Sequence, residues 1–477
     1  MAVNHVDLAI IGSGSGNSLI TPDFAEKRVV VIESGTFGGT CLNVGCIPTK
    51  MFVYAAEVAQ SAREASRYGV DAQVSGVRWR DIRDRVFGRI DPISAGGLDY
   101  RRHGEHTGVL QGRARFVAPR ELEVRLNAGG SERLSADQIV IAAGSRATVP
   151  EAIRAGGARW HTSDDVMRLE ELPERMIIVG GGFIAAEFAH VFSALGVEVT
   201  LVVRGPGLLR AEDEQIAAAY TQAARRRWEV LLGTEVVATR SSGPGVEVDL
   251  SDGTSRSAGV LLVATGRTPN SDDLGLAEAG IETHEDGRVR VDQHGRTSAT
   301  GVWALGDVSS AHMLKHVANH EARVVAHNLA HPQDLHSFDH RFVPAAVFSD
   351  PQVASVGERE QDLRARGARY VTSVQRYSDT AYGWAMEDEH GLCKLLADPA
   401  TGRLLGAHIL GPHASTLIQP AIQAMSLGST VAEVARGQYW IHPALSEVLE
   451  NALLGLDLTA ASEVLEMPVE GEGAAQP

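Results

Sequence analysis

Short apolar runs recur along the chain at strand length, and several of them end in a glycine-rich turn. Residues 6–11 and 176–179 are each followed by such a turn, by a helical stretch, and by a second apolar strand at 29–32 or 197–203. This order predicts two β-α-β units, because a glycine turn at a helix N-terminus presents backbone N–H groups to a pyrophosphate. The turns are about 170 residues apart. The pattern therefore predicts two dinucleotide-binding sites on one chain.

Three further apolar strands end in glycine turns and begin at Gln138, Val260 and Gly301, before, inside and after the second unit. Their positions predict that the second unit is inserted into the domain built by the first. The expected fold class is α/β, with two Rossmann-like dinucleotide-binding domains and an α+β C-terminal domain. The predicted boundaries are 1–150 and 270–340 for the discontinuous first domain, 151–269 for the inserted domain, and 341–456 for the third.

The C-terminal part has a different pattern. Residues 391–397 and 403–410 are typical of antiparallel strands, and 417–427 and 445–454 have helical patterns. Residues 457–477 contain five acidic residues, no basic residue and no apolar periodicity. We expect this acidic tail to be disordered, because it has too little apolar surface to bury.

Composition narrows the classes of function. Of the 477 residues, 44% are hydrophobic, which is enough for several buried cores. The 44 basic and 60 acidic residues give a net charge of −16, which argues against nucleic acid or an anionic membrane as the main partner. No apolar run approaches the roughly 18 residues of a membrane-spanning helix, and the N-terminus has no signal-peptide pattern. We therefore expect a cytoplasmic protein that binds neither nucleic acid nor membrane.

Two of the three cysteines, Cys41 and Cys46, are only five residues apart. On an ideal helix their Cα atoms would exceed the roughly 7 Å limit for a disulfide, but Gly45 can supply a local distortion. Pro48 suits the first turn of a following helix, which places Cys46 near a helix N-terminus where a thiolate is stabilised. The alternatives are a metal half-site or two separate buried thiols. Metal binding needs more ligands than the remaining Cys393 offers, so the spacing favours a redox pair, and we predict no metal site.

The motif GGTCLNVGCIPTK at 38–50 and the order of the glycine turns resemble the class I pyridine nucleotide-disulfide oxidoreductases, the family of glutathione reductase and lipoamide dehydrogenase. The resemblance covers residues 6 to about 456. It implies a homodimeric enzyme that uses FAD and a nicotinamide cofactor to reduce a small-molecule disulfide through Cys41 and Cys46. Within the family, five longer passages are most similar to the mycothione reductases, which implies mycothiol disulfide as the substrate. These passages are 41–59, 183–196, 315–325, 382–388 and 435–454.

The first glycine turn, with Gly12 and Gly14, is expected to hold the FAD pyrophosphate, which makes the discontinuous domain the FAD-binding domain. Glu33 ends the next strand, 21 residues after Gly12, where its carboxylate can accept hydrogen bonds from ribose hydroxyls. Asn17 stands where a third small residue is usual, and Pro22 interrupts the crossover. We therefore expect the helix between these strands to be short or irregular.

The resemblance implies further roles around the flavin. Lys50 is placed near flavin N5 with Glu187 as its partner, and Asp307 at the ribityl chain. Close relatives carry two adjacent basic residues where this chain has Thr49 and Lys50. We therefore assign the position near flavin N5 to Lys50 alone. The other implied FAD contacts are Gly39, Thr40 and Gly144.

The inserted domain is expected to bind NADPH. Its second strand reaches Arg204 rather than an acidic residue, and Arg210 follows six residues later. The 2′-hydroxyl of NAD favours a carboxylate at this position, whereas the 2′-phosphate of NADPH favours guanidinium groups. Phe183 stands where many family members have a tyrosine that covers the flavin until nicotinamide enters. The other implied NADPH residues are Gly180, Gly182, Ala185, Glu187 and Gly266.

His442 and Glu447 are the third group of candidate catalytic residues. The histidine side chain titrates near neutrality, which suits proton transfer to a departing thiolate, and a carboxylate five residues later can orient the ring. By resemblance this pair reaches the Cys41 side from the partner subunit of the homodimer. The resemblance also implies that Cys41, the more accessible thiol, attacks the substrate, and that Cys46 lies next to the flavin.

Three histidines, His312, His316 and His320, recur at helical spacing after the predicted flavin motif, and we assign them neither a metal nor a function. Dihydrolipoamide dehydrogenase and glutathione reductase-like activity are alternative functions within the family. Arg204 argues against an NAD-dependent dihydrolipoamide dehydrogenase. Outside the enzymes, the alternative is a flavin-binding scaffold without turnover, which the presence of both cysteines and of the His–Glu pair disfavours.

Overall fold

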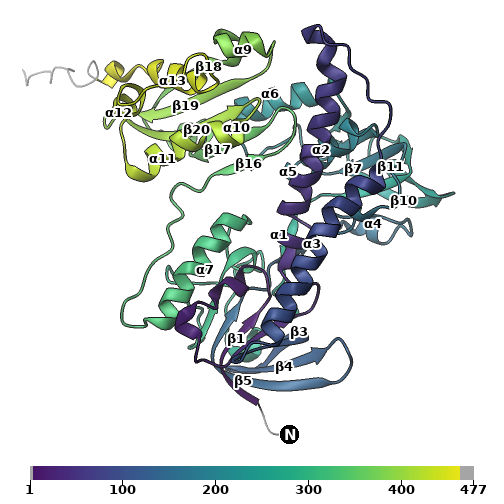
Figure 1. Cartoon of the computed structure of the whole chain (residues 1–477), viewed down its shortest axis with the longest axis vertical. Helices are drawn as coiled ribbons and strands as arrows, with labels where there is room; N and C mark the ends of the chain where they lie inside the picture. The colour runs from purple at the N-terminus through teal and green to yellow at the C-terminus, as the bar shows by residue number, and fades with distance from the viewer. Residues whose placement is uncertain (1–3, 462–477) are drawn as a thin grey trace, which may run out of the picture. The chain divides into compact units, whose positions relative to one another are not determined.

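The computed structural model describes residues 4–461 and is drawn as a cartoon in Figure 1. Its internal contacts divide the chain into two compact units. The first unit consists of Met1–Pro206 and Trp228–His340, and the second of Gly207–Arg227 and Arg341–Pro477. The first unit thus holds most of both predicted dinucleotide-binding domains. Their further division into an FAD and an NADPH domain stays a prediction.

Parallel strands form the centre of the first β-α-β region. In the order of pairing they are β3 (Thr107–Ala118), β2 (Val29–Glu33), β1 (Asn4–Ile11), β5 (Ser131–Ile141) and β15 (Val302–Ala304). The strand β4 (Glu121–Leu126) pairs antiparallel with both β3 and β5. Ile139, Val140 and Ile141 of β5 are all 0% exposed, so both faces of the sheet are covered. This order and burial are typical of a dinucleotide-binding fold.

The crossover from β1 to β2 contains no regular α-helix. It consists of two short 3-10 turns, Ser15–Leu19 and Pro22–Phe24. The expected irregular crossover is therefore confirmed, and Pro22, which has no N–H to donate, begins the second turn. The helix α7 (Lys315–Ala330) packs beside these turns, with Val325 in one buried cluster with Ile10 of β1 (Figure 1).

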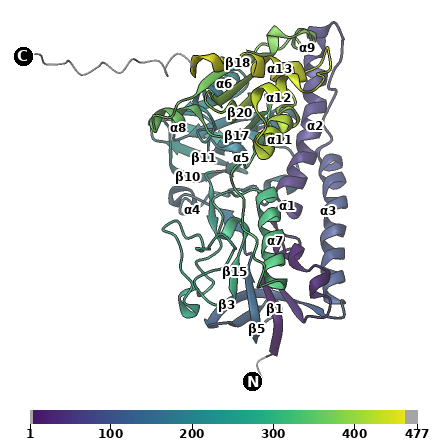
Figure 2. The same cartoon turned by 90° about the vertical axis from the view of Figure 1, so that its left-hand side faces the viewer.

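Three helices follow β2, namely α1 (Gly39–Asn43), α2 (Cys46–Glu64) and α3 (Trp79–Arg102). The long helices α2 and α3 are in contact in the first unit (Figure 2). Phe52 of α2 stacks on Trp79 of α3 with ring centroids 5.1 Å apart, and the Trp79 indole donates to the Leu169 carbonyl oxygen at 2.7 Å. This packing fixes the position of α2, which carries Cys46 as its first residue.

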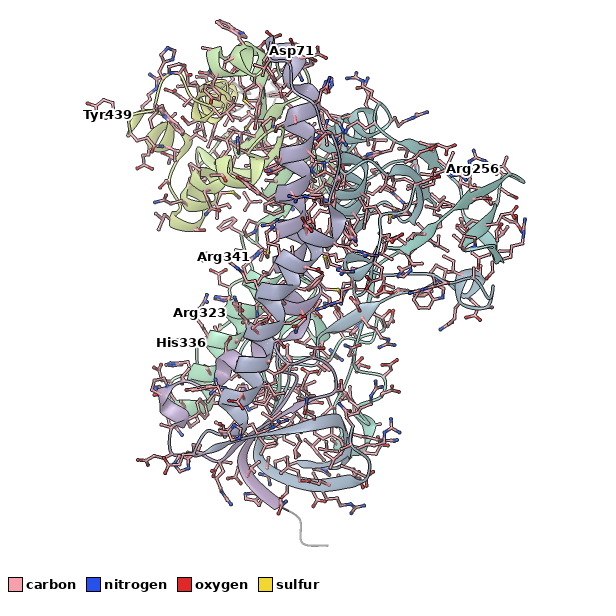
Figure 3. The ribbon with its side chains drawn as sticks, turned by 45° about the vertical axis from the view of Figure 1, so that its right-hand side comes forward. Asp71, Arg256, Arg323, His336, Arg341 and Tyr439 are labelled. Atoms are coloured by element: carbon pink, nitrogen blue, oxygen red, sulfur yellow. The ribbon has the colours of Figure 1, made fainter. Side chains whose placement is uncertain are left out.

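A second parallel sheet lies in the same unit. Its strands in order are β13 (Val260–Val263), β7 (Arg175–Val179), β8 (Glu198–Val203) and β9 (Glu229–Leu232). The helix α5 (Phe183–Ala194) connects β7 to β8, as the sequence predicts. Two antiparallel sheets complete the unit: β10 (Val236–Ser242), β11 (Gly245–Leu250) and β12 (Ser255–Ala258), with Arg256 labelled in Figure 3, and β6 (Ser145–Ala147) with β14 (Arg267–Pro269).

The second unit contains a five-stranded antiparallel sheet. Its strand order is β16 (Ala345–Val347), β17 (Val353–Gly357), β20 (Arg403–Leu410), β19 (Leu392–Asp398) and β18 (Val371–Arg376). β19 and β20 confirm the two predicted strands. The helices α11 (Gln419–Leu427) and α13 (Ser446–Leu454) confirm the predicted helices. The fold class is therefore the predicted one, α/β with an α+β C-terminal part.

Residues 207–227 belong to the second unit through a buried ion pair. Lys394 of β19 is 2% exposed, and its Nζ lies 2.8 Å from Oδ1 of Asp213 and 2.6 Å from Oε2 of Glu360. Asp213 is 0% exposed and also caps the helix α6 (Glu214–Ala224), because its Oδ1 accepts from the Gln215 N–H at 3.0 Å. The pair thus connects α6 to the antiparallel sheet.

The remaining short elements are η3 (Ala65–Tyr68), α4 (Glu151–Arg154), η4 (Val166–Arg168), η5 (Ala277–Ala279), η6 (Gly306–Val308), α8 (Glu360–Ala365), η7 (Tyr377–Asp379), α9 (Ala381–Ala385), α10 (Ala414–Leu417), α12 (Val431–Arg436) and η8 (Leu458–Ala461). The η8 turn falls within the predicted acidic tail, and its Leu458 packs against the core of the second unit. The rest of that tail lies outside the described residues. None of the helices in the described part of the chain has the length and apolar content of a membrane span.

Candidate active site

The two neighbouring cysteines lie where one helix ends and the next begins. Cys41 is in α1, and Cys46 is the first residue of α2. Gly45 between them has φ −127° and ψ −121°, outside the helical region. A Cβ atom on Gly45 would lie 2.9 Å from the Thr40 carbonyl oxygen and 3.3 Å from the Cα of Cys41. Glycine therefore permits the predicted distortion, which brings the two thiols into hydrogen-bond contact.

The two thiols differ in acidity. The hydrogen bond from the Cys41 thiol is the main cause that lowers the pKa of Cys46 to about 6, with help from the charge of Lys50 and against the effect of burial. The same hydrogen bond, followed by burial, raises the pKa of Cys41, while nearby Lys315 acts in the opposite direction. The N-terminus of α2 also favours negative charge on Cys46. In the free thiol pair Cys46 is therefore the thiolate at neutral pH, and Cys41 is the proton donor to it.

Lys50 of α2 faces Glu187 of α5. The Lys50 ammonium is 2.7 Å and 2.8 Å from the two carboxylate oxygens of Glu187. The Glu187 side chain is 4% exposed and that of Lys50 is 34% exposed. The structure thus places the two predicted partners together and holds a positive charge one helical turn from Cys46.

Gly12 and Gly180 occupy equivalent places in the two glycine turns. Their φ angles, +106° and +137°, lie in the region that favours glycine. A Cβ atom would lie 2.2 Å from the Ala142 carbonyl oxygen at Gly12, and 2.2 Å from the Ala264 carbonyl oxygen at Gly180. Both turns therefore pack in the same way against the end of a neighbouring parallel strand, β5 or β13. That edge of the sheet is where dinucleotides bind in this type of fold.

The first turn also meets α1 and the end of β2. A Cβ atom on Gly39 would lie only 2.5 Å from the Cα of Gly14. The backbone N–H and hydroxyl of Ser13 donate to Oε2 of Glu33 at 3.0 Å and 2.6 Å, and the Ser13 oxygen accepts from the Gly38 N–H at 2.8 Å. A carboxylate offers about four acceptor positions, so Glu33 retains capacity for a ribose hydroxyl. The residues at this turn therefore fit an adenine dinucleotide.

Asp307 lies in the turn after β15. Its Oδ2 accepts from the Ser145 hydroxyl at 2.6 Å, and Arg267 donates to the Ser145 side-chain and carbonyl oxygens at 2.8 Å and 2.7 Å. The preceding Gly306 N–H donates to Oε2 of Glu321 at 2.6 Å. The Glu321 side chain is 2% exposed, and burial raises its pKa. Two sets of contacts from different elements thus fix the conformation of this turn.

The second glycine turn leads directly into α5. Gly182 is the N-cap residue, and Phe183 at the first helical position is 44% exposed. Ala185 is fully buried. Gly266, with φ +127°, follows β13, and a Cβ atom there would meet no atom within 4 Å. The start of the 12-residue helix α5 presents free backbone N–H groups, and these suit a phosphate group.

The two arginines predicted to bind the 2′-phosphate belong to different units. Arg204 follows β8 in the first unit, where its side chain is 86% exposed and its Nε lies 3.8 Å from Oε1 of Glu235. Arg210 is exposed and belongs to the second unit. Because Arg204 and Arg210 belong to different units, their joint contact with one phosphate group stays a prediction.

His442 and Glu447 are in direct contact in the second unit. The Nδ1 of His442 lies 2.6 Å from Oε1 of Glu447, while Oε2 of Glu447 accepts from the Ala444 N–H at 3.1 Å. The hydrogen bond from His442 is the main cause that lowers the pKa of Glu447, and burial opposes it. The His442 side chain is 73% exposed. The carboxylate thus orients the ring and leaves its Nε2 edge accessible.

The three histidines at helical spacing do not share one helix. The helix α7 begins at Lys315, so His312 precedes it and does not lie on one helical face with His316 and His320, although the spacing would allow it. The His312 and His320 rings instead lie 5.6 Å and 6.5 Å from the ring of His340. Burial lowers the pKa of both.

Comparison with known families identifies the fold and the site. The family described as pyridine nucleotide-disulphide oxidoreductase matches residues 6–322. The chain belongs to this family. The dimerisation domain of the same pyridine nucleotide-disulphide oxidoreductases matches residues 343–453, which correspond to the sheet and helices of the second unit.

Several known proteins are similar to this chain over nearly its whole length. The chain is 58% identical to the mycothione reductase of Mycobacterium tuberculosis over 456 residues, covering 94% of this chain and 99% of that protein. It is 35% identical to the mercuric reductase of Streptomyces lividans, over 97% of each chain. Among solved structures, the HOCl-induced flavoprotein disulfide reductase RclA from Escherichia coli has a TM-score of 0.83 and 27% identity, covering 94% of this chain and 99% of RclA.

Family membership settles the class of chemistry. The chain is a pyridine nucleotide-disulphide oxidoreductase enzyme, with FAD and NADPH as its cofactors. The residues at both glycine turns fit two such dinucleotides. The assignment of individual side chains to these cofactors stays a prediction, including Gly144, Thr40 and Ala185.

The structure adds residues that sequence reasoning missed. Ser13 and Ser145 hold the carboxylates of Glu33 and Asp307, and Lys315 acts on Cys41. Lys315 also donates from Nζ to the Ser15 hydroxyl at 2.8 Å. Lys315 lies in the passage 315–325, which marked the family, but nothing in its spacing connects it to a cysteine more than 270 residues earlier. Only the folded chain brings the two together.

Proposed function

We propose that the chain reduces mycothiol disulfide to two molecules of mycothiol at the expense of NADPH, through FAD and the Cys41–Cys46 pair. The observation that carries this proposal is the thiol pair itself, which lies at the break between α1 and α2 with the pKa of Cys46 lowered to about 6 beside Lys50. The choice of substrate rests on the 58% identity to a mycothione reductase over nearly all of both chains.

The two glycine turns supply the cofactor sites of the proposal. Gly12, Gly14 and Glu33 would hold the adenine end of FAD, and the turn of Asp307 its ribityl chain. The turn of Gly180 and Gly182 would hold the NADPH pyrophosphate. When bound, FAD accepts a hydride from NADPH and passes two electrons to the disulfide.

The thiol steps balance in atoms and electrons. Reduction of the Cys41–Cys46 disulfide by two electrons and one proton, the equivalents of one hydride, leaves one thiol and one thiolate. Cys41, once deprotonated, attacks the substrate disulfide, which forms a Cys41–substrate mixed disulfide and releases the first thiolate. Cys46 then attacks the Cys41 sulfur, which restores the protein disulfide and releases the second thiolate. Both leaving thiolates take up a proton, so each cycle produces two thiols.

His442 supplies the proton transfers in this scheme. Neutral His442 would remove the proton from Cys41, and the resulting imidazolium would protonate the first leaving thiolate. The hydrogen bond between Nδ1 and Glu447 holds the orientation of the ring. We propose that the pair acts in the partner subunit's site, in a homodimer formed through the matched dimerisation domain.

Arg204 supports NADPH over NADH, because a guanidinium group pairs with a 2′-phosphate and a 2′-hydroxyl has no charge to offer. This disfavours dihydrolipoamide dehydrogenase activity, whereas glutathione reductase-like activity would share the nucleotide. We propose a cytoplasmic location, because a reducible thiol pair operates in a reducing compartment.

The test is steady-state turnover of the purified dimer with mycothiol disulfide, glutathione disulfide and lipoamide, each with NADPH and with NADH. We expect the highest kcat/KM for mycothiol disulfide with NADPH, by at least about 100-fold over the other substrates. A higher kcat/KM for glutathione disulfide or lipoamide would overturn the substrate, and preference for NADH would overturn the nucleotide. Absence of turnover with all three, with FAD bound, would favour the scaffold.

A further inference from the structure

Metal-ligand side chains gather at the C-terminal end of α7, in the first unit. One ring nitrogen each of His327 and His336 and a carboxylate oxygen of Asp334 all lie within 4.8 Å of one another. The Nε2 of His327 is 3.6 Å from Oδ2 of Asp334. The rings of His327 and His336 are stacked, with centroids 3.6 Å apart and an angle of 12° between their planes. Two imidazoles and a carboxylate are thus in one place, from a helix and the loop that follows it.

The loop that carries two of these ligands is held by a buried amide. Asn328 of α7 is 0% exposed, and its Nδ2 donates to the carbonyl oxygens of His294 and His336, each at 3.0 Å. Its Oδ1 accepts from the His336 N–H at 2.7 Å. The two hydrogen bonds to His336 fix its backbone beside His327, and the third connects the same amide to His294. The ligand positions are therefore preorganised by a residue that offers no ligand itself.

A third histidine lies at the edge of the group. His331, four residues after His327, has its ring centroid 4.7 Å from that of His327. It ends α7, and its carbonyl oxygen accepts from the Asp334 N–H at 2.9 Å, which turns the chain back toward the helix. His336 is labelled beside α7 in Figure 3. The group therefore offers two imidazoles and one carboxylate, with a third imidazole beside them.

Coordination requires the imidazole rings to turn as well as to approach, because the planes of His327 and His336 are nearly parallel and a ring nitrogen binds a metal ion in the plane of its own ring. Coordination through Nε2 of His327 also replaces its 2.8 Å contact with the Asp334 carbonyl oxygen. A tetrahedral ion with bonds of about 2.0–2.2 Å separates its ligand atoms by about 3.3 Å, so the three groups need to approach by no more than about 1.5 Å. His336 and Asp334 are exposed, which leaves their side chains free to rotate. Water can complete the coordination shell if His331 does not.

We propose that His327, Asp334 and His336 bind a divalent transition metal ion of the zinc class. Imidazole nitrogen favours Zn²⁺, Cu²⁺ and Ni²⁺, whereas Mg²⁺ and Ca²⁺ require mostly oxygen ligands. The bound ion connects the end of α7 to the loop before His340 and stabilises that connection. The group shares no residue with the thiol pair or the glycine turns, so the inference does not rest on the proposed function.

The experiment is a calorimetric titration of the oxidised holoenzyme with Zn²⁺, in which the Cys41–Cys46 pair is a disulfide and offers no thiolate to the metal. We expect one ion per subunit that is lost, or weakened at least about tenfold, in His336→Ala and in His327→Ala. The matched control is His284→Ala, an exposed histidine outside the group, which should bind Zn²⁺ as the unchanged protein does. Equal Zn²⁺ affinity and stoichiometry in all four proteins, or no binding in any, would overturn the proposal.

A second measurement separates coordination from a change in folding. The variants are accepted only if their FAD content and disulfide reductase turnover match the unchanged enzyme. Co²⁺ should then produce visible ligand-field bands of tetrahedral intensity in the unchanged enzyme and in His284→Ala, but not in His336→Ala. Mg²⁺ in tenfold excess should not displace Co²⁺. Bands that persist in His336→Ala, or displacement by Mg²⁺, would exclude a zinc-class site at these residues.

Discussion

The Lys50 ammonium lies between α2 and α5, within 2.8 Å of both oxygens of the Glu187 carboxylate. The two residues come from the first and the second β-α-β region, so this contact joins the two parallel-sheet regions of the first unit. It also holds a positive charge one turn from Cys46, whose pKa it helps to lower. The ion pair thus connects the position of α5 to the acidity of the thiol pair.

Replacing Lys50 by Met should raise the pKa of Cys46. The value of about 6 depends first on the Cys41 hydrogen bond and then partly on the Lys50 charge, so it should rise but stay below the ordinary thiol value. We expect an increase of about 1 pH unit from the loss of a nearby opposite charge. The measurement is the pH dependence of iodoacetamide alkylation of the reduced enzyme, in which the rate rises as the thiolate forms.

Lys27→Met is the control for Lys50→Met, because Lys27 is exposed and outside the site. Its alkylation profile should match that of the unchanged enzyme. An unchanged profile in Lys50→Met would show that the Cys41 hydrogen bond and the helix N-terminus alone set the acidity of Cys46.

Replacing His442 by Gln should separate the two half-reactions. Loss of a general acid and base lowers turnover by about 100-fold or more, so disulfide reduction should slow to that degree. Hydride transfer from NADPH to FAD, measured by anaerobic stopped-flow, should be unchanged. Glu447→Gln should have a smaller effect on turnover, since the amide oxygen still accepts a hydrogen bond from Nδ1 and keeps the ring oriented. Equal loss in both half-reactions would contradict a role confined to the thiol steps.

Arg204→Ala should raise the KM of NADPH and leave the KM of NADH unchanged. A charge-assisted hydrogen bond contributes about 1.5–3 kcal/mol, so KM for NADPH should rise at least about tenfold. KM for NADH should not change, because NADH carries no 2′-phosphate. Arg175→Ala, an exposed arginine at the start of β7, is a control that should alter neither value. A parallel rise for both nucleotides would assign Arg204 a structural role.

The Glu321 carboxylate should control retention of FAD through the Gly306 turn. Glu321→Ala removes the acceptor for the buried Gly306 N–H, which costs about 1–3 kcal/mol and loosens the turn that presents Asp307. We expect purified Glu321→Ala to hold FAD about tenfold more weakly by fluorescence of released flavin. Glu321→Gln keeps a carbonyl acceptor and should retain FAD. Loss of FAD in both variants would mean that the charge, and not the hydrogen bond, is required.

Lys394→Met should destabilise the second unit strongly. Removing one member of a buried ion pair costs about 3–5 kcal/mol, because the Asp213 carboxylate stays buried without its partner. The comparison is Arg364→Met, whose side chain is 60% exposed and 3.7 Å from the same Glu360, and which should hardly change the melting temperature. Thermal unfolding followed by circular dichroism distinguishes the two variants.

The same ion pair predicts a pH dependence. Burial opposes ionisation of Asp213, but the hydrogen bonds from Lys394 and the Glu360 backbone outweigh it and lower the pKa of Asp213. A carboxylate with a lowered pKa in the folded state contributes stability above its unfolded pKa of about 3.9, and that contribution is lost as pH falls further. The difference in melting temperature between the unchanged enzyme and Lys394→Met should therefore be constant near neutrality and shrink below about pH 4. A difference that does not shrink at all as pH falls below the unfolded pKa would contradict this assignment.

Much of the site follows from local spacing. The five-residue interval with Gly45 between two cysteines, the glycine that ends each first strand and the strand end at Glu33 are features of short segments, so local patterns predict them. The irregular first crossover also followed from one local property, the missing N–H of Pro22. The start of α7 did not follow from a local pattern. The repeat of His312, His316 and His320 is also compatible with a helix that begins three residues earlier.

The sequence by itself determined which chemistry the chain carries: two dinucleotide turns, a pair of cysteines and a histidine with its carboxylate. Only the tertiary structure decided which charges act on that chemistry, because Coulomb interactions depend on distance in space and not on separation along the chain. Lys315 near Cys41, Glu321 at Gly306 and Asp213 beside Lys394 are each distant in sequence from the group they influence. The residues His327, Asp334 and His336 are close in sequence, yet their grouping also depends on the fold, since the hydrogen bonds of Asn328 hold the loop at His336 beside the helix.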